Sequence, residues 1–290
     1  MIVYDYAFAP FVDYGFMRRA LVACLALAMG GAPLGVFLVL RRMALVGDAM
    51  SHAILPGVSI AFLGFGISLL PMTLGGLIAG LLVALAAGIV TRLTTLKEDA
   101  SFTGAYLLSL AAGVLIISVK GNSIDLMHVL FGNVLAVNRE SLLMESGITT
   151  FSLLALAIIY RSLIVECFDP GFMRSVGGKG AIAHQLFLML VVLNLVSAFQ
   201  ALGTLMALGV MVLPAIAARF WTKNIDIMIA ISILFAFCAS FIGLLLSYHY
   251  SLPSGPAIVL TAGLFYVISV LLGRHGSIAT HFLPHKHYTS

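Results

Sequence analysis

Long stretches without charged residues constrain the fold of this chain more than any other feature. They run approximately over residues 20–40, 53–90, 100–119, 141–160, 181–218, 227–248 and 251–273. One helix needs roughly 20 apolar residues to cross the hydrocarbon core of a membrane, so the longest stretches must fold back on themselves. Charged residues make up only 9% of the chain, against about 25% in a typical soluble domain. The solvent of this protein is therefore the lipid bilayer.

Turn residues divide these stretches into membrane-spanning helices. The breaks are expected at residues 64–71, 199–203 and 250–256, where glycine, proline and polar residues interrupt the apolar pattern. The expected spans cover about residues 17–40, 50–68, 72–91, 100–118, 142–160, 181–198, 202–218, 226–247 and 256–273. Residues 124–137 are too short and too interrupted to cross, and are expected on the outer face. The sequence thus predicts a single transmembrane domain over residues 1–290, an all-α integral membrane protein with a polytopic bundle of about nine (eight to ten) helices.

The basic residues predict which side of the membrane each end of the chain faces. Most of the 15 basic residues lie at span ends on one side of the membrane. Only four, Arg18, Arg19, Lys120 and Arg139, lie on the other side. Because basic residues are enriched on the cytoplasmic side, the amino terminus is expected outside and the carboxyl terminus inside. The basic residues do not cluster on one amphipathic face, so no nucleic acid is expected as a partner.

Asp48 and His52 form the most informative constellation in the sequence. A helix places residues four apart on one face, with Cβ atoms about 6 Å apart, and a carboxylate and an imidazole at that distance can hold a divalent transition metal. Pro56 cannot donate to the carbonyl of His52, which leaves a third oxygen on the same face. Ionisable residues inside a membrane span indicate function. Asp48 and His52 are therefore candidate metal ligands, and Ser51 is a candidate pathway residue.

The pattern leaves other interpretations of these polar residues open. Asp48 could instead cap the second helix, with His52 bonded to a neighbouring backbone group. His128 and Asn133, in the outer segment, either line the pathway at its entrance or only satisfy a loop. The histidines of the cytoplasmic tail, residues 274–290, either bind a transition metal or are simply solvated.

The longest inside loop, about residues 162–180, mixes charged residues with aromatic ones. Asp169 and Pro170 are typical of a helix start, and predict a short helix with an apolar edge formed by Phe168, Phe172 and Met173. Such an edge suits docking into the cleft of a partner, or it lies on the membrane surface. The candidate docking residues are Glu166, Phe168, Asp169, Phe172, Arg174 and Gly177.

Motifs for enzymatic chemistry are absent from the sequence. Residues 177–180 lack the leading glycine and the following hydroxyl of a phosphate-binding loop. Zinc-protease and serine-hydrolase motifs are also missing. The chain is therefore not expected to be an enzyme, and an intramembrane acid–base enzyme would lack a second carboxylate at membrane depth. With enzymes excluded, the expected function is transport driven by a partner ATPase. The alternative is a stand-alone ion-coupled transporter.

Segments spread along the chain resemble the permeases of ATP-binding-cassette (ABC) importers for zinc, manganese and sometimes iron. They are RRMALVGDAMSHAILPGV (41–58), DLMHVLFGNVLAV (125–137), FDPGFMRSVG (168–177), ALGTLMALGVMVLPAIAAR (201–219) and PSGPAIVL (253–260). The resemblance implies a fold similar to the vitamin B12 and siderophore permeases. The tail is longer than the family pattern leads us to expect.

The resemblance also implies partners, a location and roles for the site residues. The partners are a second copy of the chain, a cytoplasmic ABC ATPase dimer and an extracytoplasmic metal-binding protein, in the bacterial cytoplasmic (inner) membrane. Asp48 and His52 are implied to contact the transported zinc or manganese, and segment 166–177 is implied to be the coupling helix that rests on the ATPase. No permanently bound cofactor is expected. The histidines favour zinc as the cargo.

Overall fold

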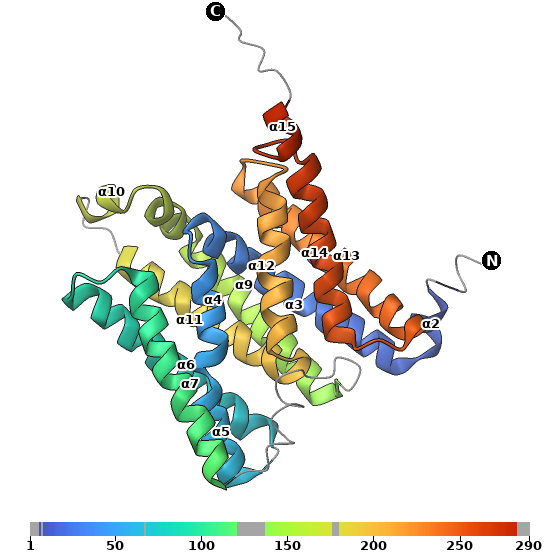
Figure 1. Ribbon diagram of the computed structural model, residues 1–290, viewed down its shortest axis with the longest axis horizontal. Helices are drawn as coiled ribbons and strands as arrows, with labels where there is room; N and C mark the ends of the chain where they lie inside the picture. Colours follow the sequence, from blue (N-terminus) through green and yellow to red (C-terminus); the bar gives the residue numbers. More distant parts are fainter. Residues whose placement is uncertain (1–5, 7, 67, 121–136, 176–179, 283–290) are drawn as a thin grey trace, which may run out of the picture.

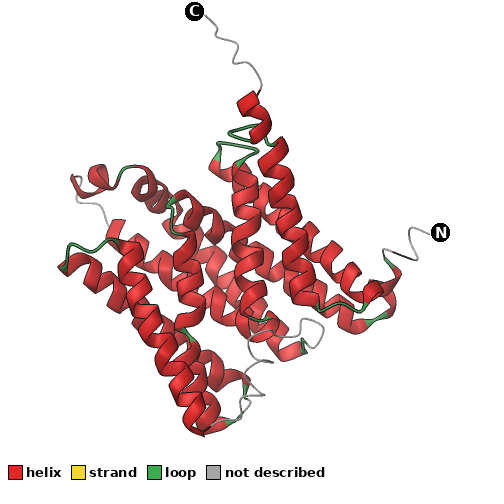
Figure 2. Cartoon of the chain, viewed as in Figure 1, coloured by secondary structure: helices red, strands yellow, loops and turns green. Residues whose placement is uncertain are grey.

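The computed structural model describes residues 6, 8–66, 68–120, 137–175 and 180–282. Within these residues every regular element is a helix (Figure 2). Eight helices are long and apolar enough to cross a membrane, and the shorter apolar helix Met206–Arg219 is a further candidate. The expected all-α polytopic bundle is thus confirmed.

The spans follow one another along the chain (Figure 1). They are α3 (Gly15–Leu40), α4 (Ala44–Ala53) continued by α5 (Leu55–Phe65), α6 (Leu69–Leu93), α7 (Glu98–Lys120), α9 (Arg139–Phe168), α11 (Gly180–Leu202), α12 (Thr204–Arg219), α13 (Ile225–Tyr250) and α14 (Ser254–Leu272). The short helices outside the spans are α2 (Ala9–Asp13), α10 (Pro170–Ser175) and α15 (Ile278–Phe282). In Figure 1, α10 and α15 both lie at the upper edge of the bundle.

The expected breaks between spans are present, and each contains a residue with left-handed backbone. Gly66 (φ 67°) follows α5, Gly203 (φ 85°) separates α11 from α12, and Ser251 (φ 52°) follows α13. Glycine adopts this conformation without a steric cost. The break at Gly203 matters most for the topology, because without it every later helix would cross in the opposite direction.

Most helix boundaries lie within a few residues of the expected ones, but two differ more. The second span begins at Ala44 rather than near residue 50, and α9 continues to Phe168, beyond the expected end at residue 160. Charged residues mark the membrane surface, but they do not end a helix, which stops only where the backbone leaves the helical conformation. As a result, α9 occupies the first part of the expected inside loop 162–180, and α10 fills most of the described remainder.

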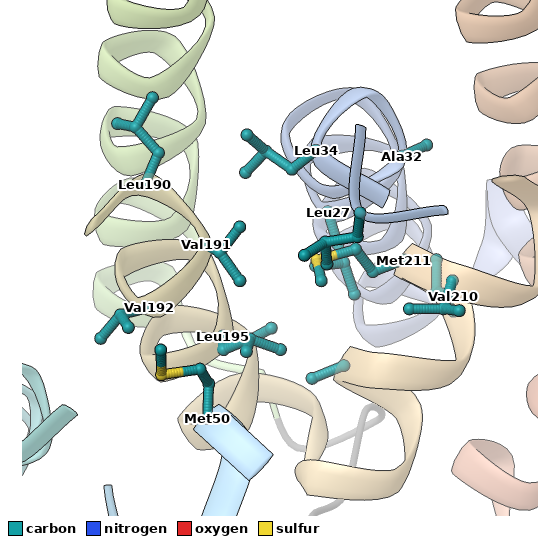
Figure 3. Close-up of a cluster of buried hydrophobic side chains, with 14 of the residues drawn as sticks. Leu27, Ala32, Leu34, Met50, Leu190, Val191, Val192, Leu195, Val210 and Met211 are labelled. Atoms are coloured by element: carbon teal, nitrogen blue, oxygen red, sulfur yellow. The ribbon is translucent and has the colours of Figure 1, made fainter. Parts of the chain in front are cut away.

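The core of the bundle surrounds α3. Within its most apolar stretch 83% of the residues are buried, against 28% for α6 and 17% for α7, so α3 is the central helix and the other two lie at the periphery of the bundle. α3 packs against α9, α11, α12 and α13. Figure 3 shows Leu27 and Leu34 of α3 in one buried cluster with Val191 and Leu195 of α11. Met50 of α4 joins the same cluster, and this packing fixes the buried face of the helix that carries Asp48 and His52.

Candidate metal site and docking surface

The turn between α3 and α4 determines where α4 begins. Arg42 has a left-handed backbone (φ 59°), and the amide of Met43 donates to the carbonyl of Leu38 at 2.8 Å. This pattern satisfies carbonyls at the end of α3 and stops the helix. Because α4 then starts at Ala44, Asp48 and His52 lie about 6 and 12 Å along its axis.

Asp48 and His52 lie on one face of α4, as their spacing predicts. Nε2 of His52 is 3.7 Å from Oδ1 of Asp48, and the two side chains are 34% and 50% exposed, respectively. This separation is longer than a hydrogen bond. Metal–ligand bonds are about 2.1 Å long, so one cation can bridge two atoms up to about 4.2 Å apart. The separation of Nε2 and Oδ1 is within that limit. The pair can therefore share one divalent cation with little rearrangement.

The imidazole of His52 is held by packing rather than by a hydrogen bond at its second nitrogen. Its Nδ1 atom is buried and has no hydrogen-bond partner among the described residues. The ring lies beside Tyr106 of α7, with ring centroids 6.3 Å apart. Histidines of tight metal sites usually donate their second N–H to a fixed acceptor.

The span is interrupted directly after the pair, at Ile54. Pro56 lies in the first turn of α5 and has no backbone N–H. The amide of Ile54 donates to the carbonyl of His52, and the hydroxyl of Ser109 in α7 donates to the carbonyl of Ala53 at 2.9 Å. The expectation that the carbonyl of His52 lacks a donor is therefore wrong, because the local turn supplies one.

The other residues expected around the pair have different outcomes. Asp48 lies inside α4 and not at its start, so the capping alternative is wrong. Ser51 is buried, and its hydroxyl donates to the carbonyl of Asp48 at 2.7 Å, so it braces α4 and its part in the pathway stays a prediction. His128 and Asn133 lie outside the described residues. Among those described, no group of three or more His, Cys, Asp or Glu side chains could hold a metal, so Asp48 and His52 could by themselves supply only two ligands.

The short helix α10 begins where the sequence predicts. The carboxylate of Asp169 accepts from the amide of Phe172 at 2.8 Å, which satisfies a free donor of the first turn. Phe168 and Phe172 are 67% and 56% exposed. Two large aromatic side chains thus project from a polar surface at the end of α9 and on α10, which suits insertion into a partner.

The remaining candidate docking residues are arranged differently from the expectation. A Cβ atom at Gly180 would lie 2.8 Å both from Cδ of Glu166 and from Cγ of Met173, so these two side chains pack on the start of α11. The expected apolar edge therefore contains the two phenylalanines but not Met173, because α10 rests against α11. The side chain of Arg174 and all of Gly177 lie outside the described part of the chain.

The sequence reasoning missed a buried carboxylate in α9. Glu145 is 2% exposed, and its Oε2 atom is 3.5 Å from the hydroxyl of Ser197 in α11. This position contradicts the expectation that no second carboxylate lies at membrane depth. The signal was available, since a charged residue inside an expected span is costly unless it has a role.

A second carboxylate–imidazole pair was also missed. Nε2 of His184 in α11 is 2.6 Å from Oε1 of Glu98 in α7. The two residues are 86 positions apart in the sequence. No local spacing indicates such a contact, because it depends on how two separate helices pack.

The sequence resembles known transport proteins over almost its whole length. The ABC 3 transport family model matches residues 13–273. The manganese transport system membrane protein MntC of Halalkalibacterium halodurans is 33% identical over 279 residues, which are 95% of this chain and 93% of the relative. The chelated iron transport system membrane protein YfeD of Yersinia pestis is 32% identical over 263 residues, which are 90% of this chain and 86% of the relative.

The fold also resembles a solved structure over almost the whole chain. The structure of PsaBC from Streptococcus pneumoniae in complex with Fab contains a chain that is 30% identical to this one, with a TM-score of 0.82. The match covers 95% of this chain and 98% of that chain. Helices with the same order and packing therefore occur in an experimentally determined protein.

Proposed function

This chain belongs to the ABC 3 transport family, and we propose from this membership that Asp48 and His52 bind its transported metal ion in passing. The chain is the multi-pass membrane permease of an ABC importer for manganese, iron or zinc, and it is not itself an enzyme. Manganese is the proposed first cargo, because a relative that matches 95% of the chain is a manganese transport protein. This choice replaces the zinc favoured by the histidines.

The geometry of the pair carries this proposal. The gap of 3.7 Å between Nε2 of His52 and Oδ1 of Asp48 accommodates a cation bound to both atoms. A carboxylate and an imidazole suit manganese, iron and zinc, whereas soft thiolates would favour zinc or copper. Conduction requires a site that also lets the ion leave, and two partly exposed ligands bind more weakly than a complete cage. Water, the backbone or a second copy of the chain would supply the remaining ligands.

The proposed assembly places the energy source on the side of α10. Phe168 and Phe172 insert into a cytoplasmic ABC ATPase dimer, and an extracytoplasmic metal-binding protein delivers the ion to the other face. The amino terminus lies outside and the carboxyl terminus inside the bacterial cytoplasmic membrane, as the basic residues predict. ATP-driven movement of α10 then alternates the access of Asp48 and His52 between the two sides.

The test is metal uptake by the complete transporter in proteoliposomes. We expect Asp48→Asn and His52→Ala each to lower uptake of radiolabelled manganese by at least about 100-fold, the upper end of what loss of a group that only supports a metal ligand costs, with assembly on the ATPase retained. Glu140→Gln serves as the control, because Glu140 is exposed and lies outside α4. Near-normal uptake of manganese, iron and zinc in both site variants would contradict the assignment.

The same preparation separates the two transport classes. The permease alone, given a proton gradient and no nucleotide, is expected to carry no metal ion. Uptake under those conditions would support the stand-alone ion-coupled transporter instead.

A further inference from the structure

The ion pair between Glu98 and His184 lies near the ends of α7 and α11 that face the ATPase side. Glu98 is the first residue of α7, and His184 lies about one turn into α11. Their distance of 2.6 Å is that of a charge-assisted hydrogen bond. The side chain of His184 is 14% exposed and that of Glu98 is 33% exposed, so surrounding residues partly shield the pair from solvent.

On one side, the pair is connected to the docking surface, which is formed by α10 and by the exposed Phe168 and Phe172. α11 starts at Gly180, where the side chains of Glu166 and Met173 leave no room for a Cβ atom. His184 follows four residues later on the same helix. Because packed side chains transmit displacement instead of absorbing it, a shift of α10 moves the start of α11 and with it His184.

On the other side, the pair is connected to the metal site through α7. This helix packs along both α4 and α5, and it lies beside them in Figure 1. Tyr106 of α7 lies against the ring of His52, and Ser109 of α7 donates to the carbonyl of Ala53 at the break after α4. These residues lie about 12 and 16 Å along α7 from Glu98. α7 thus carries the ion pair at one end and the contacts to the site in its middle.

Arg41 offers Glu98 a second cationic partner. Its guanidinium group interacts electrostatically with Glu98, and its Nη1 atom is buried without a hydrogen-bond partner in the described structure. A buried donor of this kind is costly to leave unpaired. Arg41, at the end of α3, thus adds a second positive charge near Glu98.

We propose that the Glu98–His184 pair couples movement of the docking surface to the position of His52 and the α4 break. The pair makes α7 and the start of α11 move together, so that a displacement applied at α10 reaches the metal ligands. Glu98 and His184 are positioning residues, since neither touches the transported ion. This inference rests on the proposed function, because it requires that a partner ATPase moves α10 and that Asp48 and His52 bind the ion.

The test measures manganese uptake and ATP hydrolysis together in proteoliposomes with the complete transporter and its manganese-loaded binding protein. For Glu98→Gln and His184→Ala we expect hydrolysis within about twofold of wild type and manganese carried per ATP lower by at least about tenfold, a coupling loss of the usual size. Exchanging the partners, with Glu98→His and His184→Glu in one chain, is expected to restore part of the ratio. The exposed control Glu140→Gln should leave it unchanged.

The outcomes distinguish this inference from a purely structural role. If hydrolysis and uptake fall in parallel, or if the exchanged pair is no better than either single variant, the pair only stabilises the fold and the coupling role is overturned. An unchanged ratio in both single variants overturns it as well. A wild-type transporter that carries no metal ion would overturn the proposed function, and this inference with it.

Discussion

At the scale of single residues, the two carboxylate–imidazole pairs differ mainly in the distance between their atoms. Asp48 and His52 are 3.7 Å apart, which leaves room for a cation, whereas Glu98 and His184 are 2.6 Å apart, which leaves none. The longer pair lies within one helix and the shorter pair joins two helices. The same two functional groups are thus the proposed ligands in one place and a link between helices in the other.

Glu145 allows a second test at this scale. Glutamine keeps the shape of the buried side chain without a charge. We therefore expect the free energy of unfolding of Glu145→Gln to lie within about 1 kcal/mol of the wild-type value. Lysine would bury an ammonium group between helices, and we expect Glu145→Lys to cost at least about 3 kcal/mol. Thermal unfolding in detergent measures both effects. Glu140→Lys, in the exposed first turn of the same helix, is the control, and equal stability of the two lysine variants would contradict the prediction.

At the scale of elements, the interrupted span α4–α5 is held against α6 by close contact of two backbones. A Cβ atom at Gly57 would lie 2.5 Å from the carbonyl carbon of Gly75 and 2.8 Å from Cβ of Ala79. Small residues permit such approach between helices in lipid, where the hydrophobic effect does not hold them together. The contact keeps α5 in place directly after the break that follows His52.

We expect Gly57→Leu to separate α5 from α6 and to cost about 1–3 kcal/mol, as overpacking of an interface does. The loss should appear as a lower midpoint of thermal unfolding in detergent. Gly64 provides the control on the same helix, because a Cβ atom there would meet nothing within 4 Å. The packing argument fails if Gly64→Leu lowers the midpoint as much as Gly57→Leu does.

At the scale of the whole molecule, the order of the crossings determines which loops face the ATPase. Counting α4–α5 as one crossing and α12 as another, the described spans make an odd number of passes, which agrees with the proposed orientation, in which α2 is outside and α15 is inside. The arrangement depends on the left-handed turn at Gly203, which separates α11 from α12. With α15 on the inside, α10 and the Glu98–His184 pair lie on the same side as the ATPase.

Single cysteines test this orientation. With Cys24, Cys167 and Cys238 replaced by alanine, we expect Glu140→Cys to react with a membrane-impermeant maleimide in right-side-out vesicles, because residue 140 is at the outer start of α9. His275→Cys should react only after the vesicles are opened, because it follows α14 on the inside. Manganese uptake by the cysteine-free parent confirms that it is folded. The reverse labelling pattern would contradict the orientation.

The sequence by itself determined the class of the protein, its spans and the spacing of its candidate metal ligands. Apolar runs, turn residues and the i,i+4 spacing of Asp48 and His52 are local along the chain, so they can be interpreted without knowing how the helices pack. For the same reason Asp169 was correctly predicted at the start of α10. The position of α4 was missed because it depends on the backbone of Arg42, a residue type that rarely takes the left-handed conformation.

Only the tertiary structure decided which faces of the helices meet. It placed Glu98 beside His184, Tyr106 beside His52 and Glu145 beside Ser197, and it turned Met173 toward α11. In a soluble protein the polar side of each helix would mark its exposed face. In a bilayer the lipid-facing and buried faces are both apolar, so the rotation of each helix cannot be inferred from hydrophobicity and is set by the close packing of side chains.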